Sequence, residues 1–122
     1  MATSKIERQE AWRTELLTET NGSIFQNRIT NAQLFIKKFA IGTMGKIVFV
    51  YCMFKAAQDI GANWAIITGF PISYGASKVE LSGNVNGANS GFYIDNAGTI
   101  FTRQAIANGA WCECSGVYVS SN

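Results

Sequence analysis

Side chains that commonly carry catalytic chemistry are scarce in this chain of 122 residues. It contains no histidine, which excludes a Ser-His-Asp or Cys-His arrangement and removes the usual zinc ligand. Beyond residue 20 the only acids are Asp59, Glu80, Asp95 and Glu113. A glycosidase needs two carboxyl groups facing each other across a cleft. Glu80 lies on an alternating strand face and Asp95 lies beside a turn, so we expect no such pair and predict that the protein is not an enzyme.

The cysteines do not indicate a metal site or a disulfide framework. Cys52, Cys112 and Cys114 are odd in number and include a C-x-C pair. A metal would need a fourth ligand that the chain cannot take from histidine. We therefore expect three small buried hydrophobic residues, with no catalytic residue, metal or cofactor.

Aromatic side chains beside polar segments are the remaining candidates for ligand binding. Trp64 follows Asn63, Tyr74 lies in the turn at 71–75, and Trp111 follows Gly109-Ala110. Exposed aromatic rings next to Asn, Ser and Gly can stack on sugar rings. A tryptophan on a β-sandwich strand usually packs inside, so Trp64 and Trp111 are expected mainly in the core, whereas Tyr74 is on a turn.

A polar, glycine-rich loop is expected at residues 83–91. Its Asn84, Asn86 and Asn89 could hydrogen-bond a ligand or could merely supply turn geometry. The candidate ligand-binding residues are therefore Tyr74, Asn84, Asn86, Asn89 and Trp64, and the site could lie on the segment 58–63, 70–77 or 83–91.

The central element of the predicted fold is the apolar run at residues 46–55, KIVFVYCMFK. Its β-branched and aromatic content, and Gly45 before it, favour a strand with two apolar faces over a short helix. A single small domain has one core, so the two faces need two covers. One can be the domain's own second sheet, and the other could be another subunit.

Short strands with regular turns between them predict an all-β fold, a sandwich or jelly roll, over residues 12–122. A three-residue hairpin loop is expected at 96–98, with Gly98 in the left-handed position, and a bulge at 115–116. Residues 1–11 are expected to be a helical or extended connecting segment. The predicted strands are 12–18, 34–41, 46–55, 64–68, 78–82, 92–95, 99–103 and 110–120.

Composition limits the partners. Hydrophobic residues make up 48% of the chain and charged residues 15%, against about 25% charged in ordinary domains. This predicts a surface partly covered by other subunits, or a face that binds glycan or protein. The net charge of +2 is scattered, which argues against nucleic acid. No apolar run approaches the ~20 residues of a membrane span, and no secretion signal is seen, so we expect synthesis and folding in the cytosol.

Four segments resemble the C-terminal receptor-binding (head) domain of tail-fibre and baseplate proteins of tailed bacteriophages and their prophage relatives. They are AWRTELLTETNG at 11–22, GKIVFVYCMF at 45–54, ITGFP at 67–71 and ANGAWCECSGVYVS at 107–120. The resemblance covers residues 12–122 and rests on patterns of hydrophobicity and turns.

The resemblance implies a homotrimer at the virion tail tip that binds host cell-surface saccharide or protein through its loops, without enzymatic activity. Other tail or baseplate proteins would attach on the N-terminal side. Two alternatives remain open from the residues. One is a structural domain of a virion or bacteriocin whose role is trimerisation itself, and the other is a monomeric carbohydrate-binding module.

Overall fold

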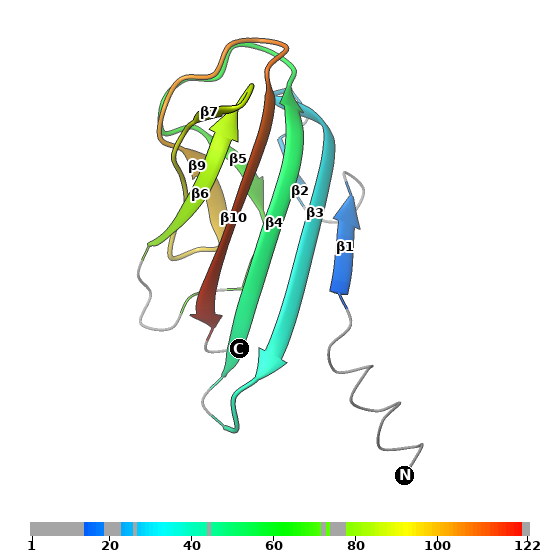
Figure 1. Ribbon diagram of the computed structural model, residues 1–122, viewed down its shortest axis with the longest axis vertical. Coiled ribbons are helices and arrows are strands. Elements are labelled where there is room, and N and C mark those ends of the chain that lie inside the picture. The colour runs from blue at the N-terminus through cyan, green and yellow to red at the C-terminus, as the bar shows by residue number, and fades with distance from the viewer. Residues whose placement is uncertain are drawn as a thin grey trace.

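A computed structural model describes residues 14–18, 23–25, 27–43, 45–71, 73 and 78–120. The connecting segment predicted at 1–11 and the candidate residue Tyr74 lie outside the described residues. Every regular element within these ranges is a β-strand and every strand pairing is antiparallel, which confirms the predicted all-β fold (Figure 1). The strands are β1 (Thr14–Thr18), β2 (Ser23–Ile24), β3 (Ile29–Ala40), β4 (Lys46–Ala56), β5 (Ala65–Thr68), β6 (Val79–Val85), β7 (Ala88–Asn89), β8 (Phe92–Ile94), β9 (Thr99–Thr102) and β10 (Trp111–Ser120).

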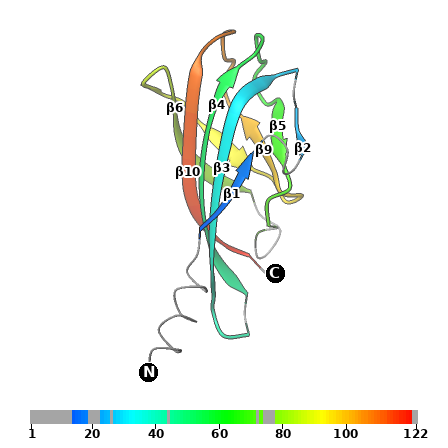
Figure 2. The same cartoon turned by 90° about the vertical axis from the view of Figure 1, so that its right-hand side faces the viewer.

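The strands form one continuous sheet in the order β1-β3-β4-β10-β6-β8-β9-β5-β2, and β7 pairs with β6 outside this path. The sheet curls so that β5 and β9 lie across the interior from β3 and β4 (Figure 2). The strand β6 makes the corner, because its residues 82–85 pair with β10 and its residues 79–81 pair with β8. The result is a nearly closed antiparallel sheet around one core.

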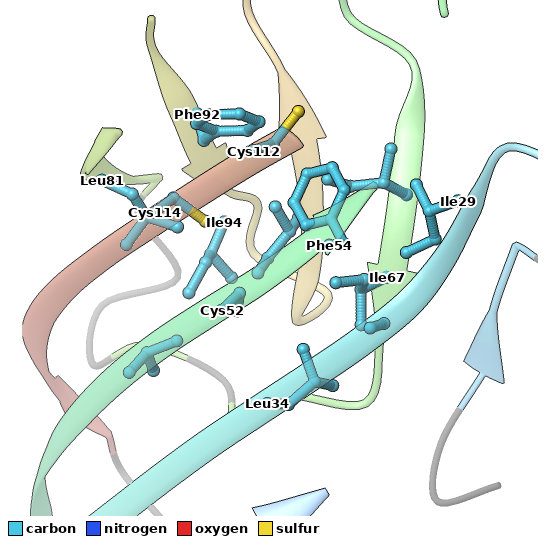
Figure 3. Packing of buried hydrophobic residues seen from close by; sticks show 14 of the residues in the cluster. Ile29, Leu34, Cys52, Phe54, Ile67, Leu81, Phe92, Ile94, Cys112 and Cys114 are labelled. Carbon is cyan, nitrogen blue, oxygen red and sulfur yellow. The ribbon is translucent and has the colours of Figure 1, made fainter. Parts of the chain in front are cut away.

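The core fills the space inside this curl with aliphatic, aromatic and cysteine side chains (Figure 3). The rings of Phe54 and Phe92 meet edge to face, with centroids 6.0 Å apart. Cys52, Cys112 and Cys114 are free and buried, as predicted. Burial is the main cause that raises the pKa of Cys112 to about 12, so its thiol stays protonated at neutral pH.

The strand β4 is buried on one face only. Its inward side chains, Val48, Val50, Cys52 and Phe54, belong to the core. On the outer face Phe49 is 41% and Tyr51 38% exposed. The two apolar faces are thus as predicted, one of them covered by the domain's own core, while a second cover on the outer face, such as another subunit, stays a prediction. The alternation of inward and outward residues still follows the predicted strand.

One strand start and one predicted bulge differ from the structure. The strand predicted at 34–41 starts earlier, and its pairing with β4 shifts register between Thr30 and Gln33, where Asn31 has a φ of 53°. The bulge expected at 115–116 is absent, since β10 pairs with β4 in unbroken register through both residues. The left-handed Gly98 in the 96–98 hairpin loop is confirmed by its φ of 84°.

Candidate functional site

The segment 83–91, predicted as a loop, is largely a β-hairpin. The strand β6 runs to Val85, Asn86 and Gly87 make the turn, and β7 returns beside β6. Asn86 has a φ of 50° and Gly87 a φ of 83°, the pair of left-handed residues that a two-residue Asn-Gly turn requires. Because Asn84 belongs to β6, it pairs with β10 and its side chain is fixed on the sheet rather than on a loop.

Trp111, the first residue of β10, is 46% exposed, so its expected place in the core is wrong. The reason is strand phase: Cys112 points inward, and its neighbour must therefore point outward. Asn86 anchors this end of β10, since its side-chain oxygen accepts from Trp111 N at 3.0 Å and its own N–H donates to Trp111 O at 2.8 Å. The ammonium of Lys55 lies 5.9 Å from the centroid of the indole.

Glu113 is the next outward residue of β10. Its carboxylate accepts a hydrogen bond of 2.8 Å from Asn84 Nδ2 and another from the phenol of Tyr51. Donation to the charged form, first by Asn84 and then by Tyr51, lowers the pKa of Glu113 below its ordinary value. The same bond, with burial and the nearby negative charge, raises the pKa of Tyr51. The carboxylate is thus held ionised and in a fixed orientation.

These side chains surround a shallow depression of about 250 Å³ on the outer face of the sheet, which we call the Trp111 surface. It lies on the strands nearer the viewer in Figure 1, beside the β6–β7 hairpin. An exposed ring, an ionised acceptor and carboxamide groups can together recognise a ligand with one apolar side and several hydroxyl groups. Its lining residues are Met53, Asn84, Asn86, Gly87, Trp111, Cys112 and Glu113.

The other carboxylates beyond residue 20 have local structural partners. Asp59 and Asp95 accept backbone N–H bonds in loops, as predicted for Asp95 beside its turn. Glu80 forms an ion pair with Arg103. Each acid is therefore oriented by its own donors, and no hydrogen bond or ion pair among the described residues joins Glu113 to a second carboxyl group. Over the same residues, no group of three or more His, Cys, Asp or Glu side chains could hold a metal ion.

Trp64 is 40% exposed, so its expected place in the core is wrong too, but its contacts indicate a packing role. The guanidinium carbon of Arg28 lies 4.8 Å from the Trp64 ring centroid and 5.2 Å from that of Phe25. Arg28 Nη1 also donates to Ala65 O at 2.7 Å. The cation is held between two rings and tied to β5, so Trp64 serves to stabilise the start of that strand.

Asn89 is exposed on β7 and lines a different depression, of about 450 Å³, together with Ser90 and Gln104. Of the residues proposed from sequence, Asn84 and Asn86 line the Trp111 surface, whereas Asn89, directly opposite Asn84 on β7, does not. Glu113 and Tyr51 were missed as site residues. The alternation of residues in β10 indicates that Glu113 points outward, so this residue could have been proposed from the sequence. Its contact with Tyr51 could not, because it depends on which strands are neighbours in the sheet.

Within the described part of the chain, no helix has the length and apolar character needed to cross a membrane. No family model, curated protein or solved structure matches this chain.

Proposed function

We propose that this domain is a non-catalytic receptor-binding head that binds cell-surface saccharide through the Trp111 surface, as in the tail-fibre and baseplate proteins that its sequence resembles. One observation carries the proposal. The exposed ring of Trp111 lies on the same strand face as the carboxylate of Glu113, which Asn84 and Tyr51 hold in place.

The chemistry of a sugar ring fits this arrangement. A pyranose has an apolar C–H face that can lie on the indole, and a rim of hydroxyl groups that need acceptors and donors. A carboxylate has about four lone-pair sites, and two hydrogen bonds leave Glu113 able to accept from a ligand hydroxyl. Because its donors already fix the carboxylate, binding loses little side-chain entropy.

The proposal includes a homotrimer of β-sandwich or jelly-roll domains at a virion tail tip. A shallow site of about 250 Å³ contacts a small part of a saccharide, so a single copy is expected to bind weakly. Three copies on one particle convert weak binding into firm attachment, because the second and third contacts form at high effective concentration.

The test is binding of bacterial surface polysaccharides on a glycan array, followed by calorimetry with the strongest binder. Trp111→Ala should lower affinity at least tenfold with little change in melting temperature, because the ring is exposed. Trp64→Ala is the matched control: it removes another exposed tryptophan and should keep the affinity of the folded protein. Equal binding by the wild type and Trp111→Ala would exclude the Trp111 surface, and no binding to any polysaccharide would exclude saccharide recognition.

A structural assembly domain is the second candidate, favoured by the other end of the same sheet face. Here Val117 is 55%, Val119 41% and Phe49 41% exposed, beside the half-buried Phe39 and Ile47. We call these five residues the apolar end. Contiguous exposed apolar side chains on a small domain commonly mark a protein contact. If the domain is such an assembly domain, its only role is to form a trimer through the apolar end.

Light scattering behind a sizing column, at low and high salt, tests the assembly. A trimer that resists salt is expected, because apolar contacts are not screened. Phe49→Ser with Val117→Thr should lower the mass, whereas Asn96→Ser, at an exposed turn, should not. A clean wild-type monomer would remove the assembly candidate and favour a monomeric carbohydrate-binding module.

A further inference from the structure

The Trp111 surface continues into two further depressions, each of which shares lining residues with the one before it. The adjoining one, of about 240 Å³, shares Asn84 and Glu113 with it. The next, of about 450 Å³, shares Ser82 and Gly83 with the second. A continuous track therefore leads from the Trp111 ring, past Glu113, across β6 at Ser82–Gly83 and on to the β7 side.

The track can cross β6 at Ser82–Gly83 because neither residue has a large side chain on the outer face. Ser82 is small and exposed. Gly83 has no side chain, and a Cβ added to it would point at the core, 2.5 Å from Phe92 Cδ1. The strand β6 changes partners here, from β10 at Ser82 to β8 at Leu81. No bulky group thus separates the depressions on the two sides of β6.

The far end of the track is polar and carries its own hydrogen-bonding groups. Asn89 and Gln104 are both exposed there. The hydroxyl of Ser90 donates to Gln104 Oε1 at 3.2 Å, which orients the carboxamide and leaves its NH₂ group to donate to a ligand. This end offers hydroxyl-binding groups without an aromatic ring, unlike the Trp111 end.

Size favours a ligand that extends along the track. Sites for small molecules usually enclose roughly 300–1,000 Å³. The depressions next to Glu113, of about 250 and 240 Å³, are each below that range. A ligand confined to one of them would leave most of its surface in water, whereas one that crosses β6 also gains the third depression.

We propose that the site takes a linear oligosaccharide of more than two sugar units, with one unit on Trp111 and a later unit at Asn89 and Gln104. This inference rests on the proposed saccharide binding, and it adds ligand length and direction. The oligosaccharide runs over Ser82, where only a small side chain separates the two subsites.

The experiment is calorimetry with fragments of two and six units from a polysaccharide that binds the wild-type protein. The wild type should bind the six-unit fragment at least tenfold more tightly than the two-unit one. Asn89→Ala with Gln104→Ala should abolish that difference by weakening the longer fragment alone. Asn96→Ala, which removes an exposed carboxamide at the β8–β9 turn, is the matched control and should bind like the wild type.

The outcomes separate the two proposals. Equal affinity for both fragments in the wild type, or unchanged binding of the six-unit fragment by the double variant, would overturn the extended track and leave the Trp111 surface intact. A double variant that weakens both fragments equally would also overturn it, because a subsite that holds only a later sugar unit should affect only the longer fragment. Failure of the folded wild type to bind any polysaccharide would remove both.

Discussion

Tyr51 on β4 donates its phenolic hydrogen bond to the carboxylate of Glu113 on β10, although the two residues are not directly opposite. Glu113 pairs with Met53 and Tyr51 pairs with Ser115, so the bond runs diagonally between the strands. On the other side of β10, Asn84 lies directly opposite Glu113 and donates the second bond. The carboxylate is therefore held by one donor from each flanking strand.

The hydrogen bond between Tyr51 and Glu113 should be detectable in the pKa values of the two side chains. The bond joins an ionised Glu113 to a neutral Tyr51, which lowers the pKa of Glu113 from the ordinary 4.5 and raises that of Tyr51 from 10.0. The lowered carboxyl pKa contributes stability above the unfolded value, which is lost as pH falls through the folded one. The raised phenol pKa contributes stability below about 10, which is lost as pH rises through the folded value.

We expect NMR titration with ¹³C-labelled tyrosine to place the pKa of Tyr51 above 10.0, and Glu113→Gln to lower it toward that value. Tyr118 is the internal control, because burial is the main cause of its own raised pKa and Glu113 is not among the causes. A Tyr51 resonance that titrates near the ordinary value in the wild type would contradict the bond.

Gly83→Ala should destabilise the fold by about 1–3 kcal/mol, the usual cost of overpacking a core. The added Cβ would lie 2.5 Å from the Phe92 ring and 2.8 Å from the backbone oxygen of Glu113. Gly116→Ala is the comparison and should cost less, since its Cβ would meet a terminal methyl group of the buried Leu81, which can shift more easily than a ring or a backbone oxygen. Urea unfolding measures both, and equal losses would contradict the close packing at Gly83.

Arg28→Lys should lower the free energy of unfolding by about 1–2 kcal/mol, because a lysine cannot place a planar guanidinium between Phe25 and Trp64. A double-mutant cycle with Trp64→Ala isolates the ring contact. We expect a coupling energy of about 0.5–1 kcal/mol from thermal or urea unfolding. Additive losses would mean that the ring and the guanidinium do not stabilise each other.

The alternation of apolar residues predicted the strands well, because a period of two is a local property of the chain. The outward phase of Trp111 could also have been read, since Cys112 and Cys114 on either side of Glu113 are apolar. The prediction that Trp111 is buried failed because it relied on residue type instead of strand phase. The dipeptide Asn86-Gly87 is a strong hairpin signal, so the loop predicted at 83–91 is wrong for a reason that is visible in the sequence.

Two residues of the Trp111 surface, Asn84 and Asn86, were among the predicted ones, but the assembly of this surface could not be predicted, because its residues come from strands that are distant in sequence. Asn84, Glu113 and Tyr51 meet only because β10 lies between β6 and β4. That order depends on how the whole sheet closes around its core, and no local pattern contains it. The exposure of the outer face of β4 can likewise be recognised only once the strand register shows on which face of the sheet each side chain lies.

The alternation along β6 and β10 has a consequence for how this surface can diversify. Each outward position, such as Asn84 or Glu113, is directly followed and preceded by an inward one that faces the core. Point substitutions can thus change the chemistry of the surface while the interior stays constant. Insertions cannot, because one added residue would reverse every later side chain of the strand. Variation of this surface should therefore arise in these strands by exchange of residues, and changes of length should be confined to the turns.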